Sequence, residues 1–528
     1  MNANKRTGFG FNIDYIYGRG IYQNQSTAMF NGNLFFYHLG DKYNAHFSFI
    51  NDNLKVAENG GITDDRYITA PLDMAQGGRT YSNGEIPVNL SNIWNHNRGY
   101  HAFLTHRYNV GFYRENPDEK DTVNTEIFVP VTSFMHTVKV DLNKREYISK
   151  DEAQNKKYFN NNYLADIQFD ETKQTSIKNT VGIQLREGFN KWAKAGLTAF
   201  ASHEYRQYTM TDTITGTPGQ RIPTKYTENT ITVGGQLIKE QGRTLHYNAT
   251  GEVAIAGEDV GQFTLEGNGN LNFKLFNDTV RLEANAYIKD LNPTFFFRHF
   301  HSKHYWWDND DLSKIMRTRI EGKLSIDRWK TQLKVGVENI KNYTYLDNTS
   351  VKQTTSSESG TAVSYLNDVK VAQCSDNIQI FSASLRQDFK LGILHLDNEI
   401  TYQKSSNQNV LPLPELNLYH NLYIRFGLAK KVLKVELGAD VRYFTQYYAP
   451  DYAPAIGQFY LQNEATKYKL GAYPLINGYV NIHLKRTRLF VEMYNILQGQ
   501  GEKSYFLVPH YPLNPRTLKI GLSWNFFD

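Results

Sequence analysis

Hydrophobic and polar residues alternate along much of this chain, and the clearest run extends from Phe263 to Leu275. Its odd positions are apolar or glycine, including Leu265, Leu271 and Phe273, and every even position is polar. Successive side chains of a strand point to opposite faces of a sheet. The run therefore predicts a strand with one apolar face and one hydrated face.

The same alternation recurs in segments 245–255, 280–289, 433–443 and 517–526. Apolar runs never exceed four residues, as in Leu34 to Tyr37, whereas a membrane-spanning helix needs about 20. Strands with one wet face are typical of antiparallel sheets. We therefore expect an all-β, antiparallel protein that has no helical membrane spans.

The links between these strands are of two kinds. Short, turn-like links fall near Asp41 and at 188–191, 241–242, 277–278, 327–328, 391–392, 429–430 and 485–487. Long polar links occupy 51–99, 143–176, 209–228, 290–315, 346–377, 404–417, 446–472 and 498–515, and the shorter links at 19–27 and 257–261 belong with them by order. Outer-membrane barrels have short periplasmic turns and long external loops. The pattern predicts a transmembrane antiparallel β-barrel of about 20 strands (roughly 16 to 22), integral to the outer membrane, with its C-terminus in the periplasm.

A soluble β-propeller or β-sandwich is the alternative all-β interpretation. Propellers show a repeat of about 40 to 50 residues, which this sequence lacks. Unstructured links as long as 51–99 are unusual in compact soluble domains and ordinary on the outer face of a barrel. We therefore expect a single barrel domain over residues 1–528.

Composition excludes several other classes of protein. The net charge of +5 is small for 528 residues and the basic residues are spread along the strands, which argues against nucleic-acid binding. Cys374 is the only cysteine, so no intramolecular disulfide is possible. The chain starts with Met1 and polar residues and shows no apolar signal-peptide segment, which predicts a mature or shortened chain.

Two regions carry a resemblance to a known family. The first is Tyr15-Ile-Tyr-Gly-Arg-Gly-Ile-Tyr-Gln-Asn-Gln-Ser26, followed by a strand pair and then Glu58-Asn-Gly-Gly-Ile62. The second is the C-terminal block with Tyr473-Pro-Leu-Ile-Asn477, Pro509-His-Tyr-Pro-Leu-Asn-Pro-Arg516 and the final Gly521 to Asp528. Both resemble the "putative porin" family of outer-membrane proteins from Bacteroidota, over almost the whole chain. The resemblance implies an outer-membrane barrel whose aromatic last strand is read by the barrel-assembly machinery. The chain departs from the family's pattern in lacking a leader and a further stretch ahead of Tyr17, and in ending on Asp528 after Phe527.

The densest group of candidate ligand-binding residues lies between Phe295 and Asp311. Trp306 and Trp307 could stack on a sugar or another planar ligand. The imidazoles nearest to a metal-binding pattern are His299, His301 and His304, but their spacing matches no closed metal site, so we predict no metal. The simpler interpretation of the segment is an aromatic girdle at the membrane rim, below a charged and hydrated loop.

Catalytic motifs are absent from the sequence. It contains no Gly-x-Ser-x-Gly elbow and no phosphate-binding Gly-x-x-x-x-Gly-Lys-Ser/Thr loop, and His203-Glu204 lacks the second histidine of a zinc-protease motif. We expect neither enzymatic activity nor a cofactor, although an outer-membrane hydrolase assembled across several strands remains the alternative.

The charged side chains on the polar faces of the strands are predicted to line a water-filled interior, because unpaired charges cannot face hydrocarbon. These residues are Glu252, Glu266, Arg281, Glu283, Arg317, Arg319, Lys323, Lys434, Glu436, Arg442 and Lys519. Both signs are present, which fits either a hydrated pore or a wall of paired charges without selectivity.

These features together favour an outer-membrane porin, a diffusion channel for passive entry of small hydrophilic solutes. Its expected partners are outer-membrane lipid, those solutes and the assembly machinery, and association of several copies is left open. The alternatives are the barrel of a TonB-dependent transporter without its plug, and a structural or enzymatic barrel.

Overall fold

The computed structural model describes residues 4–115, 126–164, 167–213, 221–275, 278–357 and 360–526. Its main element is one antiparallel sheet of 20 strands in which each strand pairs with the next one along the chain. The strands of this sheet are β1 (Thr7–Arg19), β2 (Ser26–Leu39), β3 (Tyr43–Ala57), β4 (Ile93–Glu115), β5 (Glu126–Ser149), β6 (Phe169–Leu185), β7 (Gly196–Thr213), β8 (Arg221–Lys239), β9 (Leu245–Gly257), β10 (Phe263–Leu275), β11 (Asp278–Leu291), β14 (Ile315–Ile326), β15 (Thr331–Lys341), β20 (Ile378–Leu391), β21 (Leu394–Ser405), β22 (Leu416–Leu428), β23 (Leu433–Phe444), β26 (Leu475–Leu484), β27 (Thr487–Tyr494) and β30 (Thr517–Trp524). The prediction of an all-β antiparallel fold of about 20 strands is confirmed.

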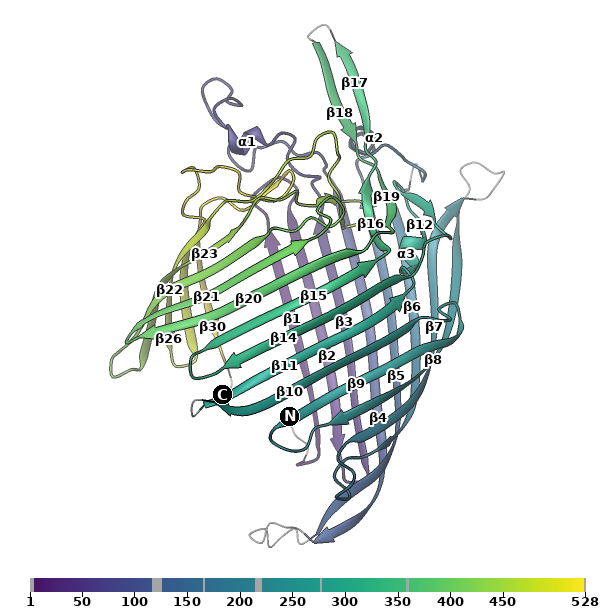
Figure 1. Cartoon of the computed structure of the whole chain (residues 1–528). Helices are drawn as coiled ribbons and strands as arrows, with labels where there is room; N and C mark the ends of the chain where they lie inside the picture. Colours follow the sequence, from purple (N-terminus) through teal and green to yellow (C-terminus); the bar gives the residue numbers. More distant parts are fainter. Residues whose placement is uncertain are drawn as a thin grey trace.

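The sheet curls round on itself, so that β2–β5 lie across the interior from β10–β15 (Figure 1). Its ladder ends at β1 on one side and at β30 on the other. Among the described residues, no helix has the length and apolar character required to cross a membrane.

The alternation in the sequence corresponds to the two faces of this sheet. Leu265 and Ile320 are 53% and 67% exposed and lie on the outer face, while Glu266 and Arg319 lie on the inner face. The register is continuous from strand to strand, so that a residue's position alone assigns its face. The outer face is therefore the apolar one.

The predicted near-alternation of short and long links holds only in part. The links 20–25, 214–220 and 258–262 on the long side are shorter than the short link 186–195, and the predicted long link 209–228 is mostly strand. Short links at 40–42, 186–195, 240–244, 327–330, 392–393, 429–432 and 485–486 join the strands at one end of the sheet. In the two-residue link 392–393, Gly392 has a φ of 60°, which suits the tight turns that join twisted strands. The predicted turn at Asn277 and the C-terminal pair Phe527 and Asp528 lie outside the described residues.

The long links are not the unstructured segments that the sequence led us to expect. They contain α1 (Arg66–Thr69), α2 (Glu152–Tyr158), α3 (Phe295–Arg298) and the small strand pairs β12 (His299–His301) with β13 (Trp306–Asp308), β16 (Tyr343–Asn348) with β19 (Val369–Cys374), β17 (Val351–Ser357) with β18 (Gly360–Leu366), β24 (Asp451–Ala453) with β25 (Gln458–Tyr460), and β28 (Phe506–Val508) with β29 (Tyr511–Pro512). The β17–β18 hairpin projects furthest from the sheet, whereas α3 and β12 lie beside the ends of β6 and β7 (Figure 1). Apolar residues of these links pack against one another, which explains why the links are ordered.

Candidate functional site

The long-link end of the sheet contains a buried apolar cluster, which we call the mouth cluster. It joins the inner faces of β4, β5 and β7 to five links, 58–92, 150–168, 292–314, 342–377 and 445–474, through Leu90, Ile93, Tyr147, Phe159, Tyr208, Met210, Phe295, Phe300, Tyr305, Leu346, Val369, Ala453, Ala455, Ile456 and Tyr460. The ring of Phe295 stacks on Tyr208 of β7 with centroids 3.8 Å apart. The link 292–314 is thus folded against the inner wall.

The segment 302–305 belongs to this buried region and contradicts the prediction of a hydrated loop above a rim girdle. The Lys303 side chain is 2% exposed, and its Nζ lies 2.7 Å from Glu152 Oε2 and donates to the Ile167 carbonyl at 2.9 Å. Glu152 also follows the N-cap Asp151 in the first turn of α2. A buried lysine is tolerated because its charge is paired and hydrogen-bonded.

The three histidines of the sequence prediction are separated in the structure. His304 stacks on Phe159 with ring centroids 3.8 Å apart, and burial lowers its pKa to about 3, so it is a neutral core residue. His299 and His301 instead share the Asp308 carboxylate, each with a nitrogen 3.0 Å from Oδ1. Among the described residues, no group of three or more His, Cys, Asp or Glu side chains is arranged to hold a metal ion.

The two predicted stacking tryptophans have different environments. Trp306 stacks on His301 with centroids 4.0 Å apart. Trp307 lines a cavity, and its Nε1 donates to the Phe296 carbonyl at 3.0 Å. Only Trp307 is therefore placed to contact a ligand in this cavity.

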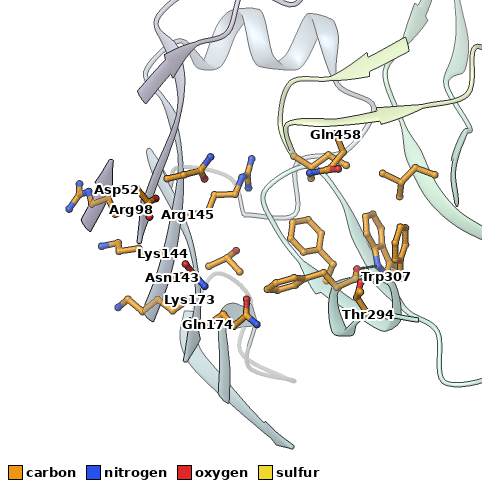
Figure 2. A pocket seen from close by; sticks show the side chains of 17 residues that line it. Asp52, Arg98, Asn143, Lys144, Arg145, Lys173, Gln174, Thr294, Trp307 and Gln458 are labelled. Carbon is orange, nitrogen blue, oxygen red and sulfur yellow. Dashed lines mark hydrogen bonds between the residues drawn. The ribbon is translucent and has the colours of Figure 1, made fainter. Parts of the chain in front are cut away.

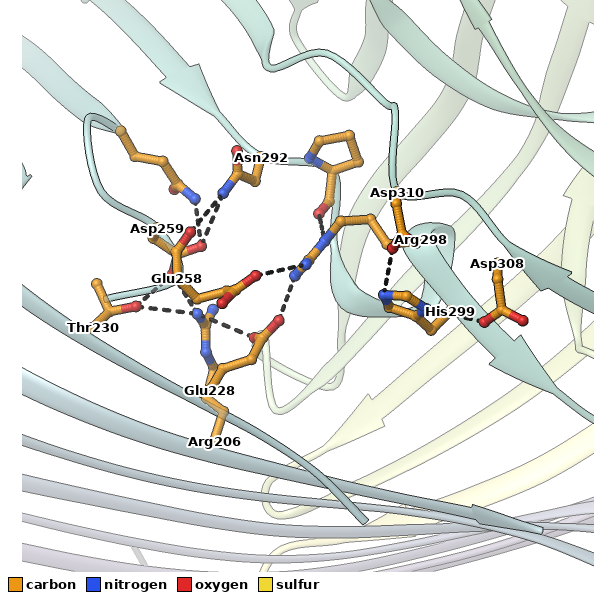
Figure 3. A network of polar contacts seen from close by, with 12 residues as sticks. Arg206, Glu228, Thr230, Glu258, Asp259, Asn292, Arg298, His299, Asp308 and Asp310 are labelled. Carbon is orange, nitrogen blue, oxygen red and sulfur yellow. Dashed lines mark hydrogen bonds and ion pairs between the residues drawn. The ribbon is translucent and has the colours of Figure 1, made fainter. Parts of the chain in front are cut away.

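A polar network ties the link 292–314 to the wall (Figure 3). Arg298 of α3 lies 2.5 Å from Glu228 of β8, and Glu228 lies 3.2 Å from Arg206 of β7. Arg206 also pairs with Asp259, whose carboxylate accepts from Asn292 at 3.2 Å. Sequence reasoning missed this network because its partners are far apart along the chain.

The cavity itself has a volume of about 460 Å³ and lies between the wall and the inward-folded links. One side is formed by residues of β4–β6, including Asn97, Asn143 and Gln174. The other side is aromatic and consists of Phe296, Phe297, Phe300 and Trp307, with Leu346, Ile456 and Gln458 beside them. Pockets that bind small molecules typically combine such an apolar lining with a few polar groups.

The polar groups of the cavity differ in how far they are already used. Arg145 points toward the cavity but donates to Asn95 and to the Ala455 carbonyl (Figure 2). The side-chain amides of Asn143 and Gln174 make no hydrogen bond with any other residue that the structure describes. These amides are free to bind a ligand, whereas the guanidinium of Arg145 is already held by Asn95 and the Ala455 carbonyl.

A second apolar cluster, the rim cluster, lies at the same end of the sheet. It brings together the links 20–25, 58–92, 445–474 and 495–516, two of which also contribute to the mouth cluster, through Tyr22, Ile62, Ile68, Ile86, Ala449, Leu470, Tyr473, Tyr505 and Phe506. At its surface His510 Nδ1 lies 3.1 Å from Asp65 Oδ1, and the hydroxyl of Tyr468 donates to Asp65 Oδ2 at 2.6 Å. Burial alone lowers the pKa of His510, but the hydrogen bond and charge of Asp65 outweigh it and the pKa is raised.

All eleven residues predicted to line the interior lie on the inner face of the sheet by register. Most of them are paired with opposite charges. The pairs are Glu266 with Lys289 at 3.0 Å, Glu283 with Lys323 at 3.4 Å, Arg317 with Glu338 at 2.5 Å, Arg319 with Glu338 at 3.4 Å, Glu436 with Arg425 at 2.6 Å and Lys519 with Glu492 at 3.5 Å.

The remaining four residues of this set have other environments. Arg442 lies over the ring of Tyr419 at 5.5 Å. Glu252, Arg281 and Lys434 form no ion pair with another residue in the described part of the chain. The residues that pair with the predicted set, such as Glu338, could also have been found from the sequence, since they occupy polar positions of alternating strands.

A family model described as "Putative porin" matches residues 1–528, and the chain belongs to this family. No curated protein matches the sequence closely enough to be informative. The fold is similar to that of the siderophore receptor PirA from Acinetobacter baumannii, with a TM-score of 0.61 and 9% identity over 99% of this chain and 76% of that one. It is also similar to a mutant of the ferric enterobactin receptor PfeA from Pseudomonas aeruginosa (TM-score 0.57, 11% identity, 99% and 76%) and to the copper transporter OprC (TM-score 0.55, 9% identity, 99% and 76%).

These comparisons overturn the prediction of a passive porin. The three solved structures named above, which share the fold over nearly the whole chain, are two receptors and a transporter. The structure also places two apolar clusters of link residues, the mouth and rim clusters, at the long-link end of the sheet, where the sequence predicts hydrated loops. Alternation of apolar and polar residues predicts the strands of the sheet, but it does not predict how the long links fold.

Proposed function

We propose that this chain forms the membrane-embedded part of an energy-coupled, TonB-dependent transporter that binds a small ligand at its outer mouth. The observation that carries the proposal is the cavity between the wall and the inward-folded links, with free amides on one side and aromatic rings on the other. The likeness to siderophore and copper transport proteins supports it.

The proposal places the sheet in the outer membrane as a closed barrel. Exposed apolar side chains such as Leu265 and Ile320 lower the free energy of the folded protein when they face hydrocarbon and raise it when they face water. Closure would cover the edges of β1 and β30, whose backbone groups have no partner in lipid. The short links would then face the periplasm, together with the C-terminus.

Energy coupling follows from the packing of the mouth. A ligand that leaves the cavity inward must displace part of the link 292–314, which the mouth cluster and the Arg298–Glu228 pair hold in place. Such a movement costs free energy that a passive channel does not need. We propose that the charged inner wall then guides the ligand, and that no catalysis is involved.

The lining of the cavity defines the class of ligand. Phe296, Phe300 and Trp307 offer flat apolar surfaces, and Asn143 and Gln174 offer amides that both donate and accept. This combination suits a ligand with a planar face and an oxygen-rich edge. The iron(III) complex of 2,3-dihydroxybenzoate and maltohexaose are two probes with such chemistry.

Calorimetric titration of the full chain in detergent with each probe tests this assignment. We expect one probe to bind, with Trp307→Ala and the double change Asn143→Ala and Gln174→Ala each weakening binding by about tenfold, as loss of one stacking contact or hydrogen bond does. Trp192, 65% exposed in the short link 186–195, provides the matched control, and Trp192→Ala should bind normally. Binding that survives both cavity variants would contradict the proposal, as would binding of neither probe.

A further inference from the structure

Three cations stand side by side on the outer face of the sheet near its long-link end. Arg98 of β4 is directly opposite Lys144 of β5, and Lys144 is directly opposite Lys173 of β6. Like charges in directly opposite positions of neighbouring strands destabilise a sheet. This rung of three cations therefore depends on anions placed close to its side chains.

The side chains of this rung point away from the ligand cavity, although their backbones border it. Figure 2 shows Arg98, Lys144 and Lys173 on the far side of the wall from Trp307. Their side chains remain partly exposed, at 39% for Arg98 and 50% for Lys173. They are thus available to a partner outside the barrel and not to a ligand inside it.

The rung lies where the apolar band of the outer face ends. On the same face, Tyr100 and Leu142 lie two residues from the rung in the direction of the short links. Ala102, Val140 and Ile177 lie four residues from the rung in that direction. Two residues of a strand span about 7 Å. The cations are therefore one such step from a surface that suits acyl chains.

Two carboxylates hold the cations in position without neutralising them. Glu146 lies 2.9 Å from Arg98 and 2.8 Å from Lys144, and Glu171 pairs with both Lys144 and Lys173. Lys55 adds a fourth cation beside them, with its Nζ 5.1 Å from the centre of the Trp94 ring. Four cations against two carboxylates leave an excess of positive charge at this level of the wall.

We propose that this outward cluster binds the phosphate of a phosphorylated lipid in the outer leaflet, with Tyr100 and Leu142 beside its acyl chains. The guanidinium of Arg98, whose Nε and Nη2 already contact His96 and Glu146, offers its Nη1 to a phosphate oxygen, and the ammonium groups of Lys144 and Lys173 act as point charges. The inference rests on the proposed membrane location and is independent of the ligand in the mouth.

Native mass spectrometry of the full chain in dodecyl maltoside, with diphosphoryl lipid A as the probe, tests the site. We expect the triple variant R98Q/K144Q/K173Q to retain the lipid on the order of 100-fold less well, since each cation near an anionic lipid surface contributes about fivefold. The matched control K191Q/K194Q/K390Q removes three exposed lysines at the short-link end and should retain it like the unchanged protein.

A second variant tests the same site without removing its cations, so that the result does not depend on the folding of the triple variant. Glu146→Gln combined with Glu171→Gln should retain lipid A more tightly, because the cations lose their internal partners. Dephosphorylated lipid A should be retained equally by the unchanged protein and by every variant. Excess inorganic phosphate should displace little lipid. Equal retention by the triple variant and the control would overturn the proposal, and so would retention that depends on neither phosphate nor Arg98.

Discussion

Individual residues at the mouth illustrate what a sequence pattern can and cannot reveal. Lys303 and His304 look like loop residues in sequence, because charged and polar neighbours surround them. In the structure both are buried, and their partners Glu152 and Phe159 lie about 150 positions away along the chain. Such pairings depend on tertiary packing, so neither their burial nor the neutral state of His304 could be predicted.

Lys303 allows a direct test of this buried arrangement. Lys303→Met removes the contacts of Nζ with Glu152 and the Ile167 carbonyl, which should destabilise the local fold by about 2 kcal/mol. We expect faster amide hydrogen exchange over residues 299–308 while the 20-stranded sheet melts as before. Lys341→Met is the control, since Lys341 is exposed at the end of β15. Unchanged exchange in the Lys303 variant would show that the segment is held by other contacts.

At the scale of elements, the strands of the main sheet were predictable and the links were not. The run from Phe263 to Leu275 is β10 to the residue, and the segment 433–443 is β23 with one more residue. Period-two alternation is a local property of these strands. The links fold by contacts between distant segments, such as Tyr22 with Leu513, so their small strands and the cavity they enclose left no periodic signal.

The contact between the links 58–92 and 495–516 should depend on pH. The pKa of His510 is raised in the folded state, so its ion pair with Asp65 stabilises the rim cluster fully below the unfolded pKa of about 6.5. This contribution is lost as the pH rises through the folded pKa. Because the His510 side chain is 46% exposed, we expect it to be worth about 1 kcal/mol or less.

Hydrogen exchange of residues 503–513, corrected for the intrinsic effect of pH, measures this change. The expected result is weaker protection on the alkaline side in the unchanged protein and no such dependence in His510→Gln. The Asp64 carboxylate, which pairs with Arg66, should not contribute, because its pKa is lowered and it stays ionised throughout. A dependence that persists in the His510 variant would assign the effect to another group.

At the scale of the whole molecule, the wall and its contents have separate determinants. The charged residues from Glu252 to Lys519 share one face of the sheet by register, since a face follows from strand position, and their lining of a water-filled interior stays a prediction. The passive porin was the wrong conclusion because the same wall can surround an open channel or a folded mouth. The account therefore depends centrally on the mouth being closed.

Single-channel recording of the full chain in planar phosphatidylcholine bilayers tests this claim most directly. Co-flotation of the chain with liposomes of the same lipid first verifies insertion. Arg298→Gln removes the ion pair between the link 292–314 and Glu228 and so provides a variant with a loosened mouth. We predict no stable open steps from the unchanged chain and brief openings from the Arg298 variant. Stable, uniform open steps from the unchanged chain would contradict the account.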